Sequence, residues 1–253
     1  MRYAPKNVAG VEVIPLCDAI GPMGPSLRRP LPEIFPNAAE ADWAGLDTTD
    51  WVLHFRCYLL RDSAGRTVLV DTGIGGPDSL AASWAPVPGR LPEELAEAGV
   101  TPTGVDVVII THLHSDHCGG AVADGLPAFP NARYVLQRAD VAWAAAPTRE
   151  RVLGPLGEQL HTVDGDAEVL PGIRVIHTPG HTPGHQVVRV GDLTLTGDLV
   201  LHPVQLANPG VRYRYDDDAE RAAATREALL AEIRASDGTI GTAHFPDPFT
   251  RLR

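Results

Sequence analysis

Basic charge is scarce in this sequence, which carries 21 Lys and Arg against 32 Asp and Glu and has a formal net charge of −11. The basic residues gather only in two short groups, Arg28-Arg29 and Arg212 with Arg214. Nucleic-acid binding depends on clustered lysines and arginines that neutralise phosphates. The sequence therefore predicts no nucleic-acid partner, and we interpret both groups as solvated surface.

Cysteines and long apolar runs are scarce as well. Cys17, Cys57 and Cys118 are odd in number and far apart, which is typical of reduced thiols in the cytoplasm rather than of a disulfide framework. No run approaches the roughly 20 apolar residues that span a membrane, and no apolar signal core follows residues 1–7. We expect a cytoplasmic protein with no membrane partner.

A hydrophobic fraction of 44% over 253 residues suits a globular chain with a sizeable core. We predict a single domain over residues 1–253. Residues 21–36 are rich in proline and glycine and too irregular for a helix. Long loops in compact enzymes often form lids or pocket walls, so segment 21–50 is interpreted as a lid or an interface segment, with a mobile surface loop as the alternative.

Apolar patterns place the remaining elements. They predict strands at 11–16, 51–60, 67–70, 107–110, 134–136, 173–176, 186–190, 193–196 and 239–243. They predict helices at 91–99, 138–146, 148–160 and 217–235, the last with Asp217 or Asp218 as its N-cap. Mixed strands with helices outside them indicate a layered α/β sandwich.

The stretch Thr111-His112-Leu113-His114-Ser115-Asp116-His117-Cys118-Gly119-Gly120 holds four metal-capable side chains within six residues. Alternate side chains of an extended segment share a face, so His112 and His114 can converge on one ion. Asp116 and His117 follow the turn and would face a second ion. The alternative is a polar surface loop that is rich in histidine, and only distant partners can separate the two interpretations.

Three candidate partners lie where predicted strands end, namely His181, Asp198 and His244. Each has an ordinary explanation by itself, as a turn, capping or surface residue. Together with the four side chains of the first stretch they supply seven N/O ligands, which suits two ions with open positions left for water. Asp71 ends another strand beside glycines, where it is either a turn former or an acceptor for the second ring nitrogen of a ligating histidine.

These motifs resemble those of the metallo-β-lactamase superfamily, in its dinuclear hydrolase branch. The matching residues are His112-Leu113-His114-Ser115-Asp116-His117, Thr178-Pro179-Gly180-His181-Thr182-Pro183-Gly184-His185, Gly197-Asp198, His244 and Val70-Asp71-Thr72-Gly73. The resemblance implies a four-layer αβ/βα sandwich of two mixed sheets with helices outside and the metals at one edge.

The resemblance also assigns the ligands. It places His112, His114 and His181 on the first ion, Asp116, His117 and His244 on the second, and Asp198 as the bridge, with Asp71 orienting a histidine. His185 is expected to be structural, and Cys118 is expected to face the core. Imidazole and carboxylate ligands favour two Zn²⁺ ions per chain, with Fe or Mn left open.

In such a site a metal-bridging hydroxide is expected to attack a small ester or lactone, with phosphotriesters also open. Asp116 and Asp198 are the predicted catalytic residues, Asp116 as the carrier of a proton to the leaving group. The lactonases of the family place a tyrosine three residues after the bridging aspartate, where this chain has Leu201. We expect the neighbouring His202 to take a similar polar role, with a structural role as the alternative.

The substrate is expected to be a small molecule held in an apolar pocket. Five aromatic residues are candidates for its wall: Phe35, Trp51, Trp84, Tyr213 and Phe245. The competing interpretations are a β-lactamase or thioesterase of the same fold, a mononuclear-iron sulfur dioxygenase, a nuclease of RNase Z type and a module that binds metal only structurally. The resembled lactonases are commonly dimers, so a homodimer is an expected assembly.

Overall fold

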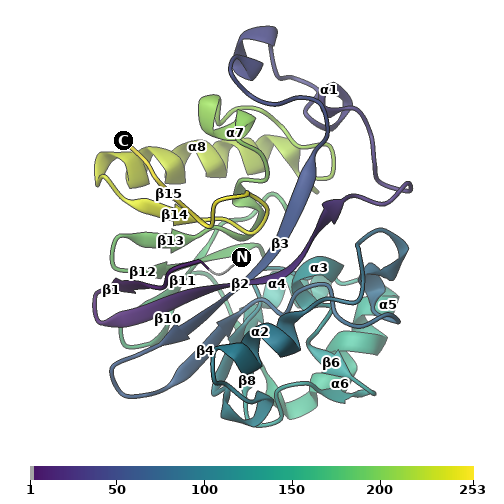
Figure 1. The fold of residues 1–253 in the computed structure, drawn as a ribbon, viewed down its shortest axis with the longest axis vertical. Coiled ribbons are helices and arrows are strands. Elements are labelled where there is room, and N and C mark those ends of the chain that lie inside the picture. Colours follow the sequence, from purple (N-terminus) through teal and green to yellow (C-terminus); the bar gives the residue numbers. More distant parts are fainter. Residues whose placement is uncertain (1–2) are drawn as a thin grey trace.

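Two β-sheets pack face to face between outer layers of helices in the computed structural model of the chain (Figure 1). The structure describes residues 3–253; Met1 and Arg2, where the predicted domain begins, lie outside the described residues. The strands of the first sheet, in spatial order, are β1 (Lys6–Val8), β2 (Val11–Pro22), β3 (Val52–Arg61), β4 (Thr67–Val70), β5 (Val107–Ile109), β8 (Arg133–Gln137) and β9 (Leu160–Val163).

The second sheet is built from the C-terminal half of the chain. Its strands, in spatial order, are β10 (Ala167–Leu170), β11 (Ile173–His177), β12 (Gln186–Val190), β13 (Leu193–Leu195), β14 (Thr239–Gly241) and β15 (Phe249–Arg251). Each sheet combines parallel and antiparallel pairs: β4 and β5 run parallel, as do β13 and β14, whereas β2 and β3 run antiparallel. A small hairpin, β6 (Val122–Ala123) with β7 (Leu126–Pro127), stands apart from both sheets.

Helices lie outside both sheets, and further short helices lie in the connecting segments (Figure 1). They are α1 (Leu31–Ile34), α2 (Leu91–Glu97), α3 (Ser115–Cys118), α4 (Arg138–Trp143), α5 (Ala146–Thr148), α6 (Gly154–Leu156), α7 (Val204–Ala207) and α8 (Ala219–Ala235). Short 3₁₀ turns are η1 (Glu40–Trp43), η2 (Leu80–Ser83), η3 (Pro102–Gly104), η5 (Gly157–Gln159) and η6 (Gly197–Leu199), and η4 (Arg149–Leu153) is a π-helical turn. Helices α2 and α4 lie beside the first sheet, and α7 and α8 lie beside the second (Figure 1).

The buried side chains form successive layers that follow this arrangement. One apolar cluster lies between the sheets and includes Val13, Leu60 and Ile109 from the first sheet with Val188 and Leu193 from the second. Further clusters join the first sheet to α2 and the second sheet to α8. The predicted four-layer αβ/βα sandwich of two mixed sheets is therefore confirmed.

Segment 21–50 leaves the body of the molecule between β2 and β3, and the part that carries α1 stands beyond the ends of these strands (Figure 1). Its apolar residues Leu31, Ile34 and Phe35 are buried in a cluster of their own. That cluster also takes in Val204 and Tyr213, which lie between β13 and β14 in the chain. The segment is thus packed down onto the part of the molecule that follows β13.

Across residues 3–253 the structure has no helix that is both long enough and apolar enough to cross a membrane.

Candidate metal centre

The residues predicted as ligands follow strands of both sheets. The His112–His117 stretch comes after β5, His181 lies between β11 and β12, Asp198 lies in η6 directly after β13, and His244 follows β14. Parallel pairing of β13 with β14 puts the ends that carry Asp198 and His244 at one edge. The structure therefore brings side chains from distant parts of the chain to a common edge of the sandwich.

Two glycines allow the first ligand loop to pack closely on the chain after β4. A Cβ atom at Gly120 would lie 2.3 Å from the carbonyl oxygen of Thr72, and one at Gly119 would lie 2.5 Å from that of Ile74. Both distances are shorter than real side chains show, so only glycine fits. The amide of Thr72 donates to the carbonyl oxygen of His117 at 2.7 Å, which fixes the end of the ligand loop.

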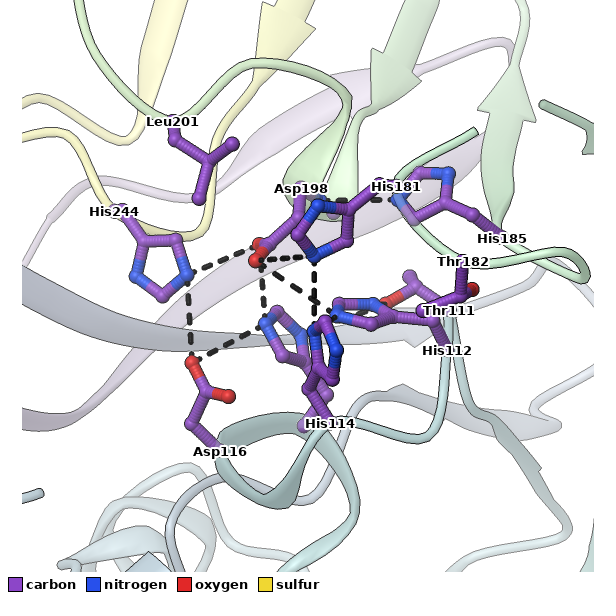
Figure 2. Close-up of polar contacts among 12 residues, drawn as sticks. Thr111, His112, His114, Asp116, His181, Thr182, His185, Asp198, Leu201 and His244 are labelled. Carbon is purple, nitrogen blue, oxygen red and sulfur yellow. Dashed lines mark hydrogen bonds and ion pairs between the residues drawn. The ribbon is translucent and has the colours of Figure 1, made fainter. Parts of the chain in front are cut away.

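Three histidine nitrogens face one another in the first group of predicted ligands (Figure 2). His114 Nδ1 lies 3.0 Å from His112 Nε2 and 2.9 Å from His181 Nε2. Asp198 Oδ2 closes the group at 3.7 Å from His112 Nε2 and 3.3 Å from His181 Nε2. All four donor atoms point towards a shared centre.

The second group uses the other oxygen of the same aspartate. Asp198 Oδ1 lies 3.1 Å from His117 Nε2 and 3.0 Å from His244 Nε2. Asp116 Oδ2 lies 3.4 Å from His117 Nε2 and 3.5 Å from His244 Nε2. Asp198 therefore stands between two sets of donors, with one oxygen turned to each (Figure 2).

Unpaired polar atoms at the centre fit a divalent metal ion. His117 Nε2 and Asp198 Oδ1 are fully buried, and although only 3.1 Å apart they have no hydrogen-bond partner of suitable geometry. A buried polar group without a partner costs free energy. Imidazole nitrogens and carboxylate oxygens are the ligand types that Zn²⁺ and similar ions take. A cation at each of the two centres would pair these atoms.

The second nitrogen of several histidines is held by a fixed partner, as metal-binding histidines require. His117 Nδ1 donates to Asp71 Oδ2 at 2.8 Å, and His244 Nδ1 donates to the carbonyl oxygen of His54 at 2.8 Å. Asp71 is the acceptor expected from the sequence. It adopts a φ of 62°, a backbone strain that tends to collect at functional sites.

Sequence reasoning missed the partner of His181. The Asp216 carboxylate accepts from His181 Nδ1 at 2.8 Å, and its side chain is wholly buried. The only signal in the sequence is the acidic run Asp216-Asp217-Asp218, of which Asp217 or Asp218 is the predicted N-cap of the following helix. Asp218 is indeed the N-cap of α8 and accepts from the Arg221 amide. The run thus serves two purposes, one of which depends on tertiary contacts.

Asp140 is a second buried carboxylate that the sequence did not point to. Its oxygens accept from the amides of Leu113 at 3.0 Å and Gly184 at 2.6 Å, and from the hydroxyl of Thr182 at 3.1 Å. These donors belong to the His112 loop and to the His181 loop. Asp140 therefore ties the two ligand loops together, although it is itself no member of either ligand group.

The titration behaviour of the centre reflects carboxylates and imidazoles crowded away from water. Burial raises the pKa of Asp198, but the His117 and His244 rings outweigh burial and hold that pKa well below its usual range. Burial and the His181 ring lower the pKa of His114 to about 3. Burial opposes the charging of His181, yet hydrogen bonds to Asp198 and Asp216 raise its pKa to about 9.

Two residues near the centre have structural contacts, in agreement with the sequence interpretation. His185 Nε2 accepts from the amide of Asp198 at 3.1 Å and so supports the bridging residue from behind. His185 Nδ1 is bonded to the Thr178 hydroxyl at 2.8 Å. The Cys118 side chain is fully buried in the apolar cluster beneath the first sheet, and burial raises the pKa of its thiol to about 12.

His202, the third predicted catalytic residue, lies elsewhere. Its ring packs among Phe35, Trp43 and Trp51 at centroid distances of 5.3–5.7 Å. Its Nδ1 accepts from the amide of Val204, and burial lowers its pKa to about 4. The side chain is absent from both ligand groups and from the wall of the neighbouring cavity, as far as residues 3–253 show. The position of His202 therefore gives no support for a catalytic role.

A cavity of about 360 Å³ opens above the two ligand groups. Asp116, His114, His181, Asp198 and His244 form its floor. Its walls are largely apolar and aromatic: Met23, Leu27, Leu53, Trp84, Leu201, Tyr213 and Tyr215. Among the five aromatic candidates, Trp84 and Tyr213 line this cavity, whereas Phe35 and Trp51 lie in the cluster behind it and Phe245 packs in the core beside α8.

A family model described as the metallo-β-lactamase superfamily matches residues 56–244, which include all seven predicted ligands. The chain belongs to this superfamily. A relative named N-acyl homoserine lactonase from Bacillus cereus is 31% identical over 198 residues, covering 70% of this chain and 73% of its own length. The lactonase AiiA from Bacillus thuringiensis subsp. kurstaki is 35% identical over the same shares of the two chains.

Solved structures share the fold of this chain. AidC, described as a dizinc quorum-quenching lactonase in complex with its product, superposes with a TM-score of 0.84 at 20% identity, covering 100% of this chain and 94% of its own. The hydrolase AbOPH gives a TM-score of 0.77 at 23% identity, over 99% and 92%. The family, the fold and the hydrolase class predicted from the sequence are confirmed.

Proposed function

We propose that this chain is a dinuclear metal-dependent hydrolase that opens small lactones, with N-acyl homoserine lactones as the first candidates. The observation that carries the proposal is the placement of two donor groups, sharing Asp198, at the floor of an apolar cavity. The names of the sequence relatives support the lactone as substrate. An apolar wall suits a ring that carries an acyl chain.

In this proposal His112, His114 and His181 hold one ion, Asp116, His117 and His244 hold the other, and Asp198 joins both. Bound at these residues, two divalent ions would supply a water of lowered pKa and would polarise the substrate carbonyl. The Asp116 carboxylate lines the cavity and is placed to carry a proton from the attacking water to the leaving alkoxide. Asp71 and Asp216 keep two ligand rings oriented.

Zinc is the metal we propose, on the strength of the His and Asp donor set and of the dizinc neighbour. We further propose a cytoplasmic, homodimeric protein whose residues 1–253 act as one domain, with segment 21–50 as its lid or interface arm. His202 is proposed to serve the packing of that segment. Three free cysteines are consistent with a reducing compartment.

The test is a substrate panel on purified protein whose metal content has been measured. The panel compares N-hexanoyl-L-homoserine lactone with an aryl ester, a thioester, a phosphotriester and a β-lactam. We expect two zinc ions per chain and a kcat/KM for the lactone that exceeds every other value. The Asp116→Asn variant should lose lactone hydrolysis while keeping the fold, because it removes the proton carrier and one ligand. A single iron per chain, or a clear preference for the thioester or the β-lactam, would refute the proposal.

A further inference from the structure

Two tyrosines line the cavity above the predicted ligands, and their hydroxyl groups differ in their surroundings. The Tyr215 hydroxyl donates to the carbonyl oxygen of Leu27 at 2.8 Å. The Tyr213 side chain is 6% exposed, and its hydroxyl makes no hydrogen bond with any residue of the described range 3–253. Buried tyrosine hydroxyls normally find a partner, so Tyr213 offers the cavity a hydrogen-bond group that the protein leaves unused.

The Tyr213 ring is held in place from several sides. It packs on His181 at a centroid distance of 6.0 Å, on Phe35 at 5.7 Å and on Trp51 at 6.2 Å. Its backbone amide donates to Asp216 Oδ2 at 3.2 Å, and the other oxygen of that carboxylate orients His181. One side chain thus fixes both the tyrosine and a predicted ligand. A donor that is positioned in advance costs no reorganisation when charge develops near it.

Few other cavity groups can donate a hydrogen bond to a substrate. Ser115 Oγ accepts the indole N–H of Trp84 at 3.0 Å and keeps its own proton, so Ser115 is a second hydroxyl donor at the cavity. Leu201 contributes only methyl groups to the wall. The carboxylates of Asp116 and Asp198 accept but do not donate when ionised. A phenol, which ordinarily titrates at about 10, is a neutral donor at working pH.

We propose that the Tyr213 hydroxyl donates a hydrogen bond to the carbonyl oxygen of the bound lactone or ester. This inference rests on the proposed hydrolase function and adds a substrate-contacting residue to it. As the water oxygen bonds to the carbonyl carbon, the C=O electron pair moves onto the carbonyl oxygen, and the Tyr213 hydrogen bond strengthens.

The electron pair on the former carbonyl oxygen then re-forms the C=O bond, and the ring C–O bond breaks. The proton that Asp116 takes from the attacking water goes to the alkoxide, which leaves the hydroxy acid as product. Tyr213 keeps its own proton throughout this sequence. Its hydrogen bond is strongest while negative charge is on the carbonyl oxygen, so it should lower the barrier more than it tightens ground-state binding.

The test compares Tyr213→Phe with two other tyrosine variants on N-hexanoyl-L-homoserine lactone. We expect Tyr213→Phe to lower kcat by about 10- to 100-fold with little change in KM, because a hydrogen bond made chiefly in the transition state is lost. Its metal content and unfolding midpoint should equal those of the wild type. Tyr215→Phe loses the bond to Leu27 and should lower kcat far less. Tyr3→Phe, whose hydroxyl bonds the carbonyl oxygen of Pro246, should leave kcat unchanged.

A Tyr213→Phe enzyme that keeps more than half of the wild-type kcat would overturn the proposal. So would a loss of kcat that is fully explained by a loss of bound metal. The same variants are measured on p-nitrophenyl acetate, which presents a carbonyl oxygen without a lactone ring. Failure of the wild type on the lactone alone counts against the proposed substrate, whereas equal rates of Tyr213→Phe and wild type on the ester count against Tyr213.

Discussion

At the scale of single residues, the orientation of each ligand histidine depends on the hydrogen-bond partner of its second ring nitrogen. His117 and His181 each donate to a carboxylate, Asp71 and Asp216 respectively, whereas His244 donates to a backbone carbonyl. A carboxylate partner raises the basicity of an imidazole and fixes its tautomer. The two carboxylate partners are therefore expected to matter for metal affinity although neither faces an ion.

Asp216→Asn should weaken the first metal site. The asparagine keeps one oxygen, which can serve either His181 Nδ1 or the Tyr213 amide but not both. Loss of such a partner typically lowers metal affinity about 10- to 100-fold. Competition with a chromogenic chelator should show this loss for one of the two ions. Asp164→Asn, which removes an exposed ion-pair partner of Arg138, is the matched control and should bind both ions normally. Equal affinities for the two variants would contradict the role of Asp216.

His202→Asn should make the protein less sensitive to acid. Burial lowers the pKa of His202 to about 4, so the unfolded chain takes up a proton below its ordinary pKa of about 6.5 while the folded chain does not. Stability is therefore lost as pH falls from about 6.5 towards 4. Asparagine keeps an acceptor for the Val204 amide but does not titrate.

The comparison uses urea unfolding at about pH 7 and about pH 5. The wild type should lose about 1–2 kcal/mol more than His202→Asn over this interval. Other titrating groups are common to both proteins, so they cancel in the difference. Parallel losses in the two proteins, together with a large fall in kcat for the variant, would instead support the catalytic role expected from the sequence.

At the scale of elements, the ligand loops are held by the strands before them and by cross-links between loops. Strand β5 delivers the His112 loop, and β11 and β12 flank the His181 loop. Asp140, in α4, accepts from the backbone of both loops and from Thr182. Asp140 thus joins the two ligand loops through hydrogen bonds of a single side chain.

Asp140→Ala should destabilise the fold and disturb both loops. It leaves the Leu113 and Gly184 amides and the Thr182 hydroxyl without their acceptor in a buried place. Each unsatisfied buried group costs about 1–3 kcal/mol, and partial relaxation makes a total of about 3 kcal/mol the expected loss. Chemical unfolding measures it, with Asp164→Ala as a surface control that should lose less than about 1 kcal/mol. A loss at Asp140 no larger than that of the control would show that the loops are held by other means.

Several elements could not be predicted from the sequence for identifiable reasons. The predicted helix over 148–160 is wrong as a continuous element, because Gly154, Pro155 and Gly157 divide it into η4, α6 and η5 before β9 begins at Leu160. Strands β1, β10 and β15 are short and lie towards the sheet edges, where too few residues repeat to give a pattern. By contrast, the predicted elements at 67–70, 186–190 and 217–235 agree with the observed β4, β12 and α8 to within two residues.

At the scale of the whole molecule, two halves of the chain each supply part of one centre. The seven predicted ligands could be found in the sequence, because metal-binding side chains follow strands in a recognisable order. The structure brings these seven side chains together in two groups. Asp140 and Asp216 could not be found in this way, since the ligand-loop residues Leu113 and His181 that they bond lie 27 or more residues away in the chain and only the folded sandwich brings them together. The unbonded hydroxyl of Tyr213 is likewise a tertiary feature.

The central claim is that Asp198 joins two metal ions in one hydrolytic centre. The most direct test is the metal content per chain of the wild type and of Asp198→Asn, measured by mass spectrometry after dialysis against zinc and then buffer, alongside lactone hydrolysis by the same samples. We predict two ions in the wild type, fewer than two in the variant and no detectable hydrolysis by the variant. One ion in the wild type, or two ions with full lactone hydrolysis in Asp198→Asn, would contradict the account.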